Sequence, residues 1–354
     1  MAPKISTLLG LLVAILITGT WAIALDFTRS FLERREFAQR DEIIRIRTEA
    51  AADSVARALH DDWQSLRFVA SQIPLNGIER IHGMLGALSS DDKRIVAANY
   101  VTASGIAEAS SHPQLRGLDL SDRPWFARGL QGSFAGDVRD AATLNTFIGG
   151  SKDNPARVID LAVPVVRDGR SIGVASLHIR KEWIERYVEE LESSLKIDLF
   201  LLSRDGQVLH SSNDIPSAPG SLESWRAAAI GEAAGLRETW PDGRRYDVSV
   251  VPAVQWADLP DFGWRMVGRL AADAPMGRQS ASLLGLPWLL ALLALATAVL
   301  VVMFALVARP LGRLAAFADR LADRGSESAG YPPSEQLTAE TAALSAALSR
   351  LEKL

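Results

Sequence analysis

The residues best suited to ligand chemistry lie together at positions 122–126. Asp122-Arg123-Pro124-Trp125-Phe126 places a guanidinium beside two aromatic rings. Arginine presents a planar fork that can hold a carboxylate through two hydrogen bonds, and aromatic rings can wall an apolar or cationic group. The segment therefore predicts a site for a small organic ion. An ordinary structural interpretation also exists, in which Arg123 pairs with Asp122 and the rings of Trp125 and Phe126 pack in a core.

Motifs of catalysis and metal binding are missing. Gly149-Gly150-Ser151-Lys152 lacks the glycine spacing of a Walker loop, and neither G-x-S-x-G nor H-E-x-x-H occurs. The five histidines are scattered singly, and His60-Asp61-Asp62 falls on consecutive helical positions that do not converge on one ion. The absence of cysteine excludes thiol catalysis and cysteine metal sites. The sequence thus predicts no enzymatic activity, no metal site and no cofactor.

Two apolar segments are long enough to cross a membrane. Residues 5–25 carry no charge, and at about 1.5 Å per residue they span roughly 30 Å, the thickness of a bilayer's hydrocarbon core. Residues 283–308 form a second uncharged segment, which begins near Pro287 and Trp288. An aromatic ring is common at the membrane interface. We therefore predict transmembrane helices at 5–25 and 283–308.

Basic flanks give the orientation of these segments. Lys4 precedes the first, and Arg309 and further arginines come after the second. Short basic flanks stay in the cytoplasm, so residues 1–4 are predicted inside and residues 26–278 outside. The first segment has an alternative, because Lys4, the apolar run and Ala22-Ile23-Ala24 also resemble a cleavable signal peptide. Both alternatives place the chain beyond residue 25 on the far side of the membrane.

The block outside predicts an α+β fold. Residues 26–71 contain no glycine or proline and place apolar side chains at helical spacing. Residues 181–195 have a second helical pattern. Strands are predicted at 95–102, 106–109, 157–166, 171–179, 197–203, 207–211, 245–254 and 263–270. Asp168-Gly169 is a strong hairpin signal. Helix and sheet thus occur twice, as two modules with antiparallel sheets and packed helices.

With these elements in place, the sequence resembles a known family, the double Cache domain, a PAS-like extracellular sensor of bacterial receptors. Residues 122–132 are similar to its "D-R-x-W/Y-F…G" segment, residues 163–177 to its central hairpin, and residues 197–206 to the first hairpin of its second module. The resemblance covers roughly residues 26–270. It implies a two-pass protein of the bacterial inner membrane with a periplasmic or extracellular sensor. The distal module is expected at about 73–180 and the proximal module at about 181–272.

The resemblance also carries implications for the site. In amino-acid-sensing members an Arg-x-Trp-aromatic segment holds the ligand's carboxylate, and Arg123, Trp125 and Phe126 match it. The tyrosine expected five residues before the arginine is Leu118, and the acidic residue that would hold an amino group is His178. We therefore expect a carboxylate or another small anion rather than an amino acid.

Asp160 joins the candidate residues conditionally. It points into the same pocket if its face of the strand is inward, whereas one step of register puts it outside. Six candidates result. The predicted ligand-binding residues are Asp122, Arg123, Trp125, Phe126, Asp160 and His178.

After the second apolar segment, residues 309–354 resemble a HAMP domain. Arg309-Pro310-Leu311 opens a stripe that continues through Leu314, Phe317 and Leu321. A connector at 325–334 precedes a second stripe at Leu337, Leu344, Leu348, Leu351 and Leu354. Two such amphipathic helices suit a four-helix bundle in a homodimer. A generic amphipathic tail is the alternative.

These features together predict a receptor. A small ligand would bind outside, and a conformational change would pass through the second span and the HAMP-like helices. The sequence stops where a histidine kinase, diguanylate cyclase or chemotaxis signalling domain normally begins, so the output is expected on a further domain or a separate partner. The alternatives are a membrane-anchored binding or scaffolding protein without signalling, and an extracytoplasmic hydrolase. The net charge of −4 offers no basic surface for nucleic acid.

Overall fold

The computed structural model describes residues 5–90, 94–141, 155–212, 222–274, 285–323 and 339–351. The chain separates into two compact units. Residues 37–275 form one unit, and residues 1–36 with 276–354 form the other. The first of these contains both β-sheets.

A long helix, α1 (Ile5–Gln72), opens the described chain. The predicted helical stretch at 26–71 is confirmed as part of it. Within the sheet-containing unit, apolar side chains at helical spacing are buried, among them Ile44, Val55, Leu59 and Leu66. The helix gives way to a short 3-10 turn, η1 (Ile73–Leu75), because Pro74 cannot continue the hydrogen-bond ladder.

The first module contains helices α2 (Ile78–Leu88) and α3 (Pro124–Gln131), a 3-10 turn η2 (Pro113–Leu115) and five strands. The strands are β1 (Ile95–Thr102), β2 (Ala107–Ser110), β3 (Phe134–Asp140), β4 (Arg157–Arg167) and β5 (Arg170–Arg180). They form an antiparallel sheet in the order β2-β1-β5-β4-β3. The predicted β4–β5 hairpin is confirmed, and its turn residues Asp168 (φ 51°) and Gly169 (φ 75°) adopt the left-handed conformation that a tight hairpin requires.

The second module repeats this plan. It contains helices α4 (Lys181–Leu195) and α5 (Glu223–Ile230). Its strands are β6 (Asp198–Leu202), β7 (Val208–Ser211), β8 (Ala234–Thr239), β9 (Arg245–Val251) and β10 (Arg265–Ala271). The strand order β7-β6-β10-β9-β8 matches that of the first sheet strand for strand. The predicted α+β fold with two tandem PAS-like modules on a long helix is confirmed.

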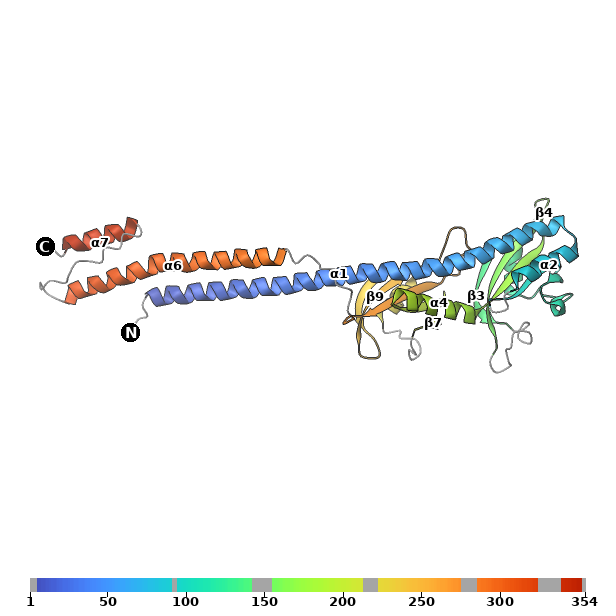
Figure 1. Ribbon diagram of the computed structural model, residues 1–354, viewed down its shortest axis with the longest axis horizontal. Coiled ribbons are helices and arrows are strands. Elements are labelled where there is room, and N and C mark those ends of the chain that lie inside the picture. Colours follow the sequence, from blue (N-terminus) through green and yellow to red (C-terminus); the bar gives the residue numbers. More distant parts are fainter. Residues whose placement is uncertain are drawn as a thin grey trace. The chain divides into compact units, whose positions relative to one another are not determined.

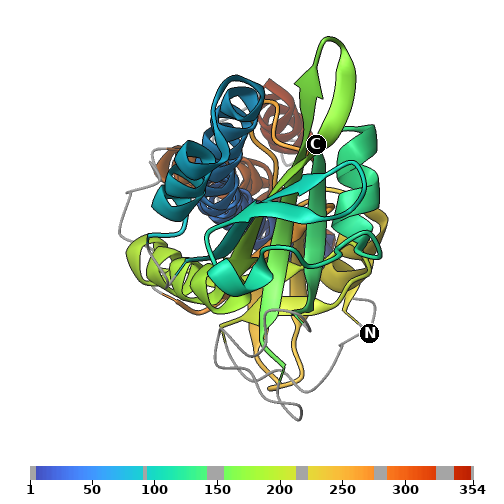
Figure 2. The same ribbon diagram turned by 90° about the vertical axis from the view of Figure 1, so that its right-hand side faces the viewer.

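Each sheet has two faces with different neighbours. One face of both sheets joins a continuous core with α1, α2 and α4, and α1 runs beside both sheets (Figure 1). The other face of the first sheet packs against α3, so this sheet lies between helices (Figure 2). The other face of the second sheet packs against α5. The candidate residues lie on the α3 face.

The other unit consists of the first part of α1 with α6 (Gly285–Asp323) and α7 (Ala339–Leu351). Among the described residues, the helix Leu11–Leu75 contains a stretch long and apolar enough to cross a membrane, with mean hydropathy 1.9 and none of that stretch buried. The apolar helix Leu290–Leu306 is shorter. Inside this unit the Trp21 indole donates to the Thr297 hydroxyl at 3.0 Å.

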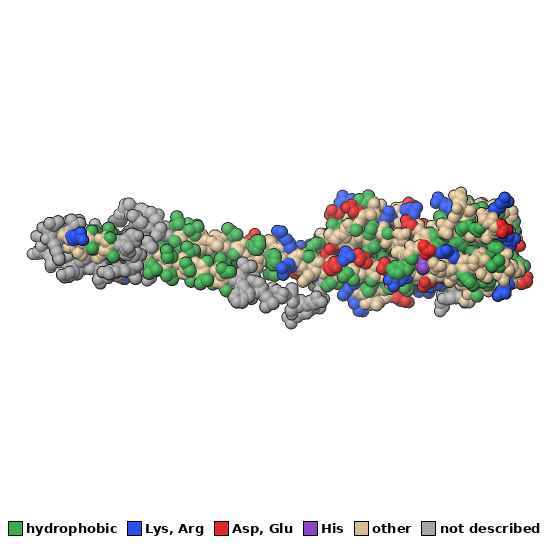
Figure 3. Space-filling view, turned by 90° about the horizontal axis from the view of Figure 1, so that it is seen from above, with side chains coloured by type: hydrophobic (Ala, Val, Ile, Leu, Met, Phe, Trp, Pro, Cys, Tyr) green, Lys and Arg blue, Asp and Glu red, His purple; other side chains and the backbone are tan. Residues whose placement is uncertain are grey.

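Hydrophobic side chains dominate the described surface of this unit in Figure 3, whereas charged side chains are spread over the unit with the sheets. The helix α6 continues without interruption through Arg309 and Pro310. The predicted N-terminal tail at 1–4 and the connector at 325–334 lie outside the described residues.

Candidate functional site

A small cavity lies on the α3 face of the first sheet. Its volume of about 20 Å³ has room for roughly one water molecule. The polar side chains that line it are Asn99, Arg123, Arg139 and His178, and the apolar ones include Leu120 and Trp125. Since Asn99, Arg139 and His178 come from three strands of the sheet, the sheet itself fixes much of the geometry.

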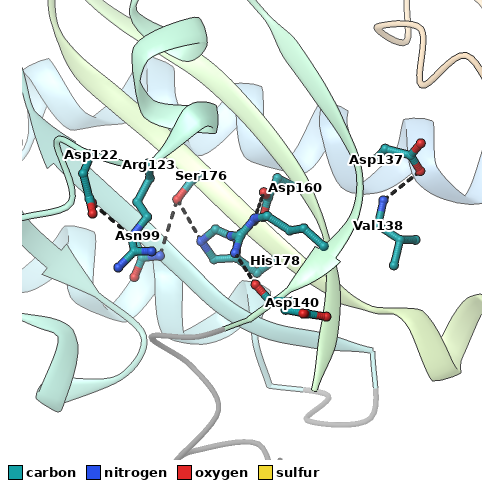
Figure 4. A network of polar contacts seen from close by, with 10 residues as sticks. Asn99, Asp122, Arg123, Asp137, Val138, Asp140, Asp160, Ser176 and His178 are labelled. Carbon is teal, nitrogen blue, oxygen red and sulfur yellow. Dashed lines mark hydrogen bonds and ion pairs between the residues drawn. The ribbon is translucent and has the colours of Figure 1, made fainter. Parts of the chain in front are cut away.

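Arg123 stands at the start of α3, with 30% of its side chain exposed. Its Nε lies 3.1 Å from Asp122 Oδ1, but the alignment is not that of a hydrogen bond, and this buried N–H has no acceptor among the described residues. Asp122 is 71% exposed, so water screens the pair and its contribution to stability is small. The guanidinium thus has an exposed carboxylate as its ion-pair partner (Figure 4) and no hydrogen-bond acceptor for its Nε among the described residues.

Trp125 and Phe126 both belong to the core on the α3 face of the sheet. Their side chains are buried, and their rings meet edge to face at 6.2 Å. The Trp125 ring also lies 5.2 Å from the His178 ring. Gly129 allows α3 to lie close to the sheet, because a Cβ at that position would lie only 2.6 Å from Val174 Cγ1 on β5. Of the two aromatics, only Trp125 lines the cavity.

Asp160 and His178 are direct cross-strand partners on β4 and β5. His178 Nδ1 lies 2.6 Å from Asp160 Oδ1, and both side chains are 3% exposed. Arg139 on β3 donates to the same carboxylate, from Nη2 to Oδ1 at 2.8 Å and from Nε to Oδ2. Burial alone raises the pKa of Asp160, but hydrogen bonds and charges from His178 and Arg139 outweigh it and hold this pKa below its usual value.

An ionised Asp160 determines the tautomer of His178. A carboxylate can only accept hydrogen bonds, so His178 Nδ1 carries the hydrogen that it donates. The Nε2 atom then faces Ser176 Oγ at 3.4 Å, and Asn99 Nδ2 approaches the same hydroxyl at 3.4 Å. Asn99, Ser176 and His178 lie in one row (Figure 4). Ser110 Oγ donates to Asn99 Oδ1 at 2.7 Å and completes this buried polar row behind the cavity.

Asp160, His178 and Ser176 make contacts in the order of a serine-hydrolase triad. Ser176, however, is fully buried and does not line the cavity. Its oxygen therefore has no room beside it for a substrate carbonyl, and the row is better explained as support for His178. Within the described residues no group of three His, Asp or Glu side chains is placed to hold a metal ion.

The structure brings part of the predicted set together. Arg123, Trp125 and His178 line the cavity, and Asp160 lies directly behind His178 on the same face of the sheet. Asp122 points to solvent beside Arg123, and Phe126 packs next to Trp125. Sequence reasoning missed two polar lining residues, Asn99 and Arg139.

A β-bulge in β3 is the reason why Arg139 was not predicted. In the pairing of β3 with β4, Gly136 opposes Asp160, but Arg139 rather than Val138 opposes Val158. The extra residue reverses the alternation, so Arg139 reaches the cavity face and Val138 packs into the core on the other face. No strand was predicted from the sequence at residues 134–140. A glycine inside a strand can mark a bulge, so Gly136 is the feature that could have indicated this one.

An open groove of about 450 Å³ runs between α4 and β7. Its helix side carries Lys181, Glu182, Glu185, Arg186 and Glu189. Mixed charges on an exposed helix face are ordinary solvated surface. On the strand side His210 is buried, and its Nε2 already has a partner in Glu192 Oε1 at 3.0 Å.

Comparisons with known proteins identify the fold. No family model matches the sequence, and no curated protein matches it. Among solved structures, the ligand-binding domain of the Campylobacter jejuni chemoreceptor Tlp3, in complex with L-norvaline, matches with a TM-score of 0.53 and 12% identity, covering 69% of this chain and 96% of that one.

Two further structures match with a TM-score of 0.50 and 16% identity. One is the extracellular domain of a protein described as a histidine kinase, rpHK1S-Z16. The match covers 67% of this chain and 96% of that domain. An extracellular ligand-binding receptor from Desulfohalobium retbaense matches 64% of this chain, which spans only 40% of that structure. At such low identity these matches concern the fold. The two-module part of the chain, with its two tandem PAS-like modules, shares its fold with these extracellular domains.

Proposed function

We propose that this chain is a transmembrane receptor that binds a small carboxylate, or another small anion, in the cavity of its first module. The observation that carries the proposal is the Arg123 guanidinium, which faces the cavity and donates no hydrogen bond among the described residues. Buried donors are normally paired, so an unpaired one beside a cavity favours an acceptor from outside the chain.

The proposed ligand is small and has both an anionic and an apolar part. Arg123 offers a two-pronged donor for a carboxylate, while Trp125 and Leu120 provide apolar walls. Because the cavity has room for about one water molecule, binding requires the walls to move apart. Such a movement is what a receptor needs, since a ligand acts on signalling only by favouring one of two arrangements.

The proposed topology places this sensor outside the bacterial inner membrane. Residues 5–25 and 283–308 are the two spans, residues 26–278 the sensor, and residues 309–354 the HAMP-like segment. The apolar surfaces of the first part of α1 and of α6 support this. In a homodimer, movement of α6 would pass to a kinase, cyclase or chemotaxis output on a further domain or a partner.

Binding is tested on the full-length chain in detergent micelles. Formate, acetate, propionate, lactate and pyruvate are titrated, with binding measured by calorimetry and thermal shift. We expect at least one to bind, and Arg123→Ala to weaken it at least tenfold, since a charge-assisted bidentate contact is lost. Arg123→Lys should retain part of the affinity because it keeps the charge without the fork.

Arg128→Ala is the matched control. Arg128 lies on the same short helix, is exposed, and stacks over Phe134 rather than lining the cavity. The affinity of this variant should equal that of the unmodified chain. Equal loss of binding in both variants would indicate a general effect of α3, and no binding of any anion would refute the proposed ligand class.

Transmission is tested separately. The chain contains no cysteine, so a single Val301→Cys substitution, at an exposed position of α6, reports on the proximity of two copies. We expect disulfide cross-linking in membranes whose rate changes when the anion that binds best is added. A rate unaffected by saturating anion would favour the membrane-anchored binding protein that does not signal.

A further inference from the structure

Asp160 is the buried carboxylate of the cavity region, and it already has a cation. Its side chain is 3% exposed and receives hydrogen bonds from Arg139 and His178. Arg139 reaches it from a neighbouring strand and keeps 27% of its own side chain exposed. A buried carboxylate needs such a partner, because an unpaired buried charge is strongly unfavourable.

The bulge in β3 makes this pairing possible. It turns Arg139 onto the face that carries Asp160 and His178, where a regular strand would have placed Val138. The remaining Nη1 of Arg139 donates to the carbonyl oxygen of Asp140 at 3.1 Å, which holds the guanidinium in place. Arg139 therefore fills the position beside Asp160 that the cationic group of a ligand would otherwise take.

The charges around the cavity then favour one class of ligand. Arg139 and Asp160 neutralise each other, and none of the described residues that line the cavity is acidic. The positive charge left over is that of Arg123, whose partner Asp122 is largely in solvent. A ligand with a carboxylate and no ammonium matches this arrangement. An ammonium group would meet two guanidinium groups and would find no free carboxylate.

We propose that Arg139 is the specificity-determining residue of this cavity: by occupying Asp160 it makes the site select small monoanions and reject zwitterionic amino acids. The inference rests on the proposed function, because it concerns the ligand class of the same site. It assigns the selectivity to one residue. Removing Arg139 frees Asp160 for an ammonium group and reduces the charge of the cavity by one.

Propionate and alanine make a matched pair of probes, since they differ by one ammonium group. The full-length chain in micelles should bind propionate at least tenfold more tightly than alanine. In Arg139→Ala the preference should reverse, with propionate at least tenfold weaker and alanine at least tenfold tighter than in the unmodified chain. The double variant Arg139→Ala/Asp160→Asn should prefer propionate again, because it lacks the freed carboxylate. Alanine binding more tightly than propionate in the unmodified chain, or a preference unchanged in Arg139→Ala, would overturn the proposal.

A second measurement does not depend on the natural ligand. Methylguanidinium resembles the tip of the missing side chain, so it should raise the Tm of Arg139→Ala by several degrees. It should have little effect on the unmodified chain or on the double variant with Asp160→Asn. If Arg139→Ala does not fold, Arg139→Gln keeps much of the side-chain length without the charge and serves in its place.

The two measurements separate two failures. If no anion binds the unmodified chain but methylguanidinium stabilises Arg139→Ala selectively, the proposed ligand class is wrong while Arg139 remains the built-in cation of Asp160. If propionate binds through Arg123 but methylguanidinium has no selective effect, the receptor proposal stands and the role of Arg139 is refuted.

Discussion

The two modules repeat one topology but fill the equivalent face of the sheet differently. In the first module the face beneath α3 carries Asp160 and His178 around a cavity, and Arg123 above it has no acceptor among the described residues. In the second module the face beneath α5 is mainly apolar and is filled by Arg269. The same fold thus surrounds a small polar cavity in the first module and a filled aromatic cluster in the second.

Arg269 is enclosed by aromatic rings. Its Cζ lies 4.1 Å from the ring centre of Tyr246, 4.2 Å from that of Trp240 and 5.1 Å from that of Phe200. Its Nε also donates to Asp198 at 2.9 Å, and the side chain is 4% exposed. Such a cage is the arrangement that proteins use to bind cationic ligands. The second module supplies that cation from its own strand, so this region serves stability rather than ligand binding.

The largest expected effect is therefore the loss of Arg269. We expect Arg269→Ala to lower the free energy of unfolding by about 3 kcal/mol, because it removes the cation–π contacts and leaves an unfilled space among the rings. Arg269→Met should recover part of this through packing alone. Urea denaturation of the full-length chain, monitored by far-UV circular dichroism, measures both. A loss below about 1 kcal/mol would mean that the cage does not depend on its own cation.

The two carboxylates that pair with arginine provide the next comparison. Asp160 is 3% exposed and Asp198 is 39% exposed. We expect Asp160→Asn to cost about 2–3 kcal/mol at pH 7 and Asp198→Asn about 1 kcal/mol or less, because water screens the second pair. The same urea denaturation measures both variants. Similar costs would show that burial does not distinguish the two modules.

The stability that Asp160 contributes depends on pH, because the pKa of this carboxyl is lowered in the folded state. A carboxylate whose pKa in the folded state lies below its unfolded value of about 3.9 stabilises the fold above that pH. This contribution is lost as the pH falls through the lowered folded-state pKa. The difference in Tm between the unmodified chain and Asp160→Asn should therefore be constant from about pH 5 to 7 and shrink below about pH 4.

Much of the fold could be predicted because its signals are local. The absence of glycine and proline predicted α1, Asp168-Gly169 predicted the central hairpin, and residues 181–195 were identified as a helix that the structure places at the same residues. The strands β3 and β8 were missed. Their sequences, Phe-Ala-Gly-Asp-Val-Arg-Asp and Ala-Gly-Leu-Arg-Glu-Thr, contain glycine and charged residues and too few β-branched residues to stand out.

The site was less predictable because its parts meet only through strand pairing. Arg123 and Trp125 could be chosen since they are neighbours in sequence. Which way Asp160 points depended on register, and the pairing of β4 with β5 places it opposite His178. Arg139 could not be chosen from alternation along the strand, because a one-residue bulge changes which side chains of β3 face the cavity.

A hydrogen bond between the modules tests how independent they are. The indole of Trp264, the residue just before β10, donates from Nε1 to Asp137 Oδ1 on β3 at 2.9 Å, on the strand that also carries Arg139. We expect Trp264→Phe to cost about 1–2 kcal/mol and to increase hydrogen exchange in β3, since a buried donor to a carboxylate is lost.

Trp225→Phe is the matched control for this hydrogen bond. Trp225 is also buried in the second module, but its Nε1 has no hydrogen-bond partner among the described residues. Its replacement should leave hydrogen exchange in β3 unchanged. Faster exchange in both variants would point to general loosening of the second module instead of a specific link.

The smallest expected effect on stability belongs to Arg123. Its guanidinium donates no hydrogen bond among the described residues and pairs there only with the exposed Asp122, so Arg123→Ala should change the free energy of unfolding by about 0.5 kcal/mol or less. Removing its buried, unpaired Nε–H even favours the folded state slightly, which offsets the packing lost with the side-chain stem. Urea denaturation without added anions gives the value. A group that contributes nothing to the unliganded fold but abolishes anion binding when removed is a binding residue, whereas Arg269 should have the opposite profile. A loss of about 2 kcal/mol at Arg123 would make both arginines structural and would remove the difference between the modules.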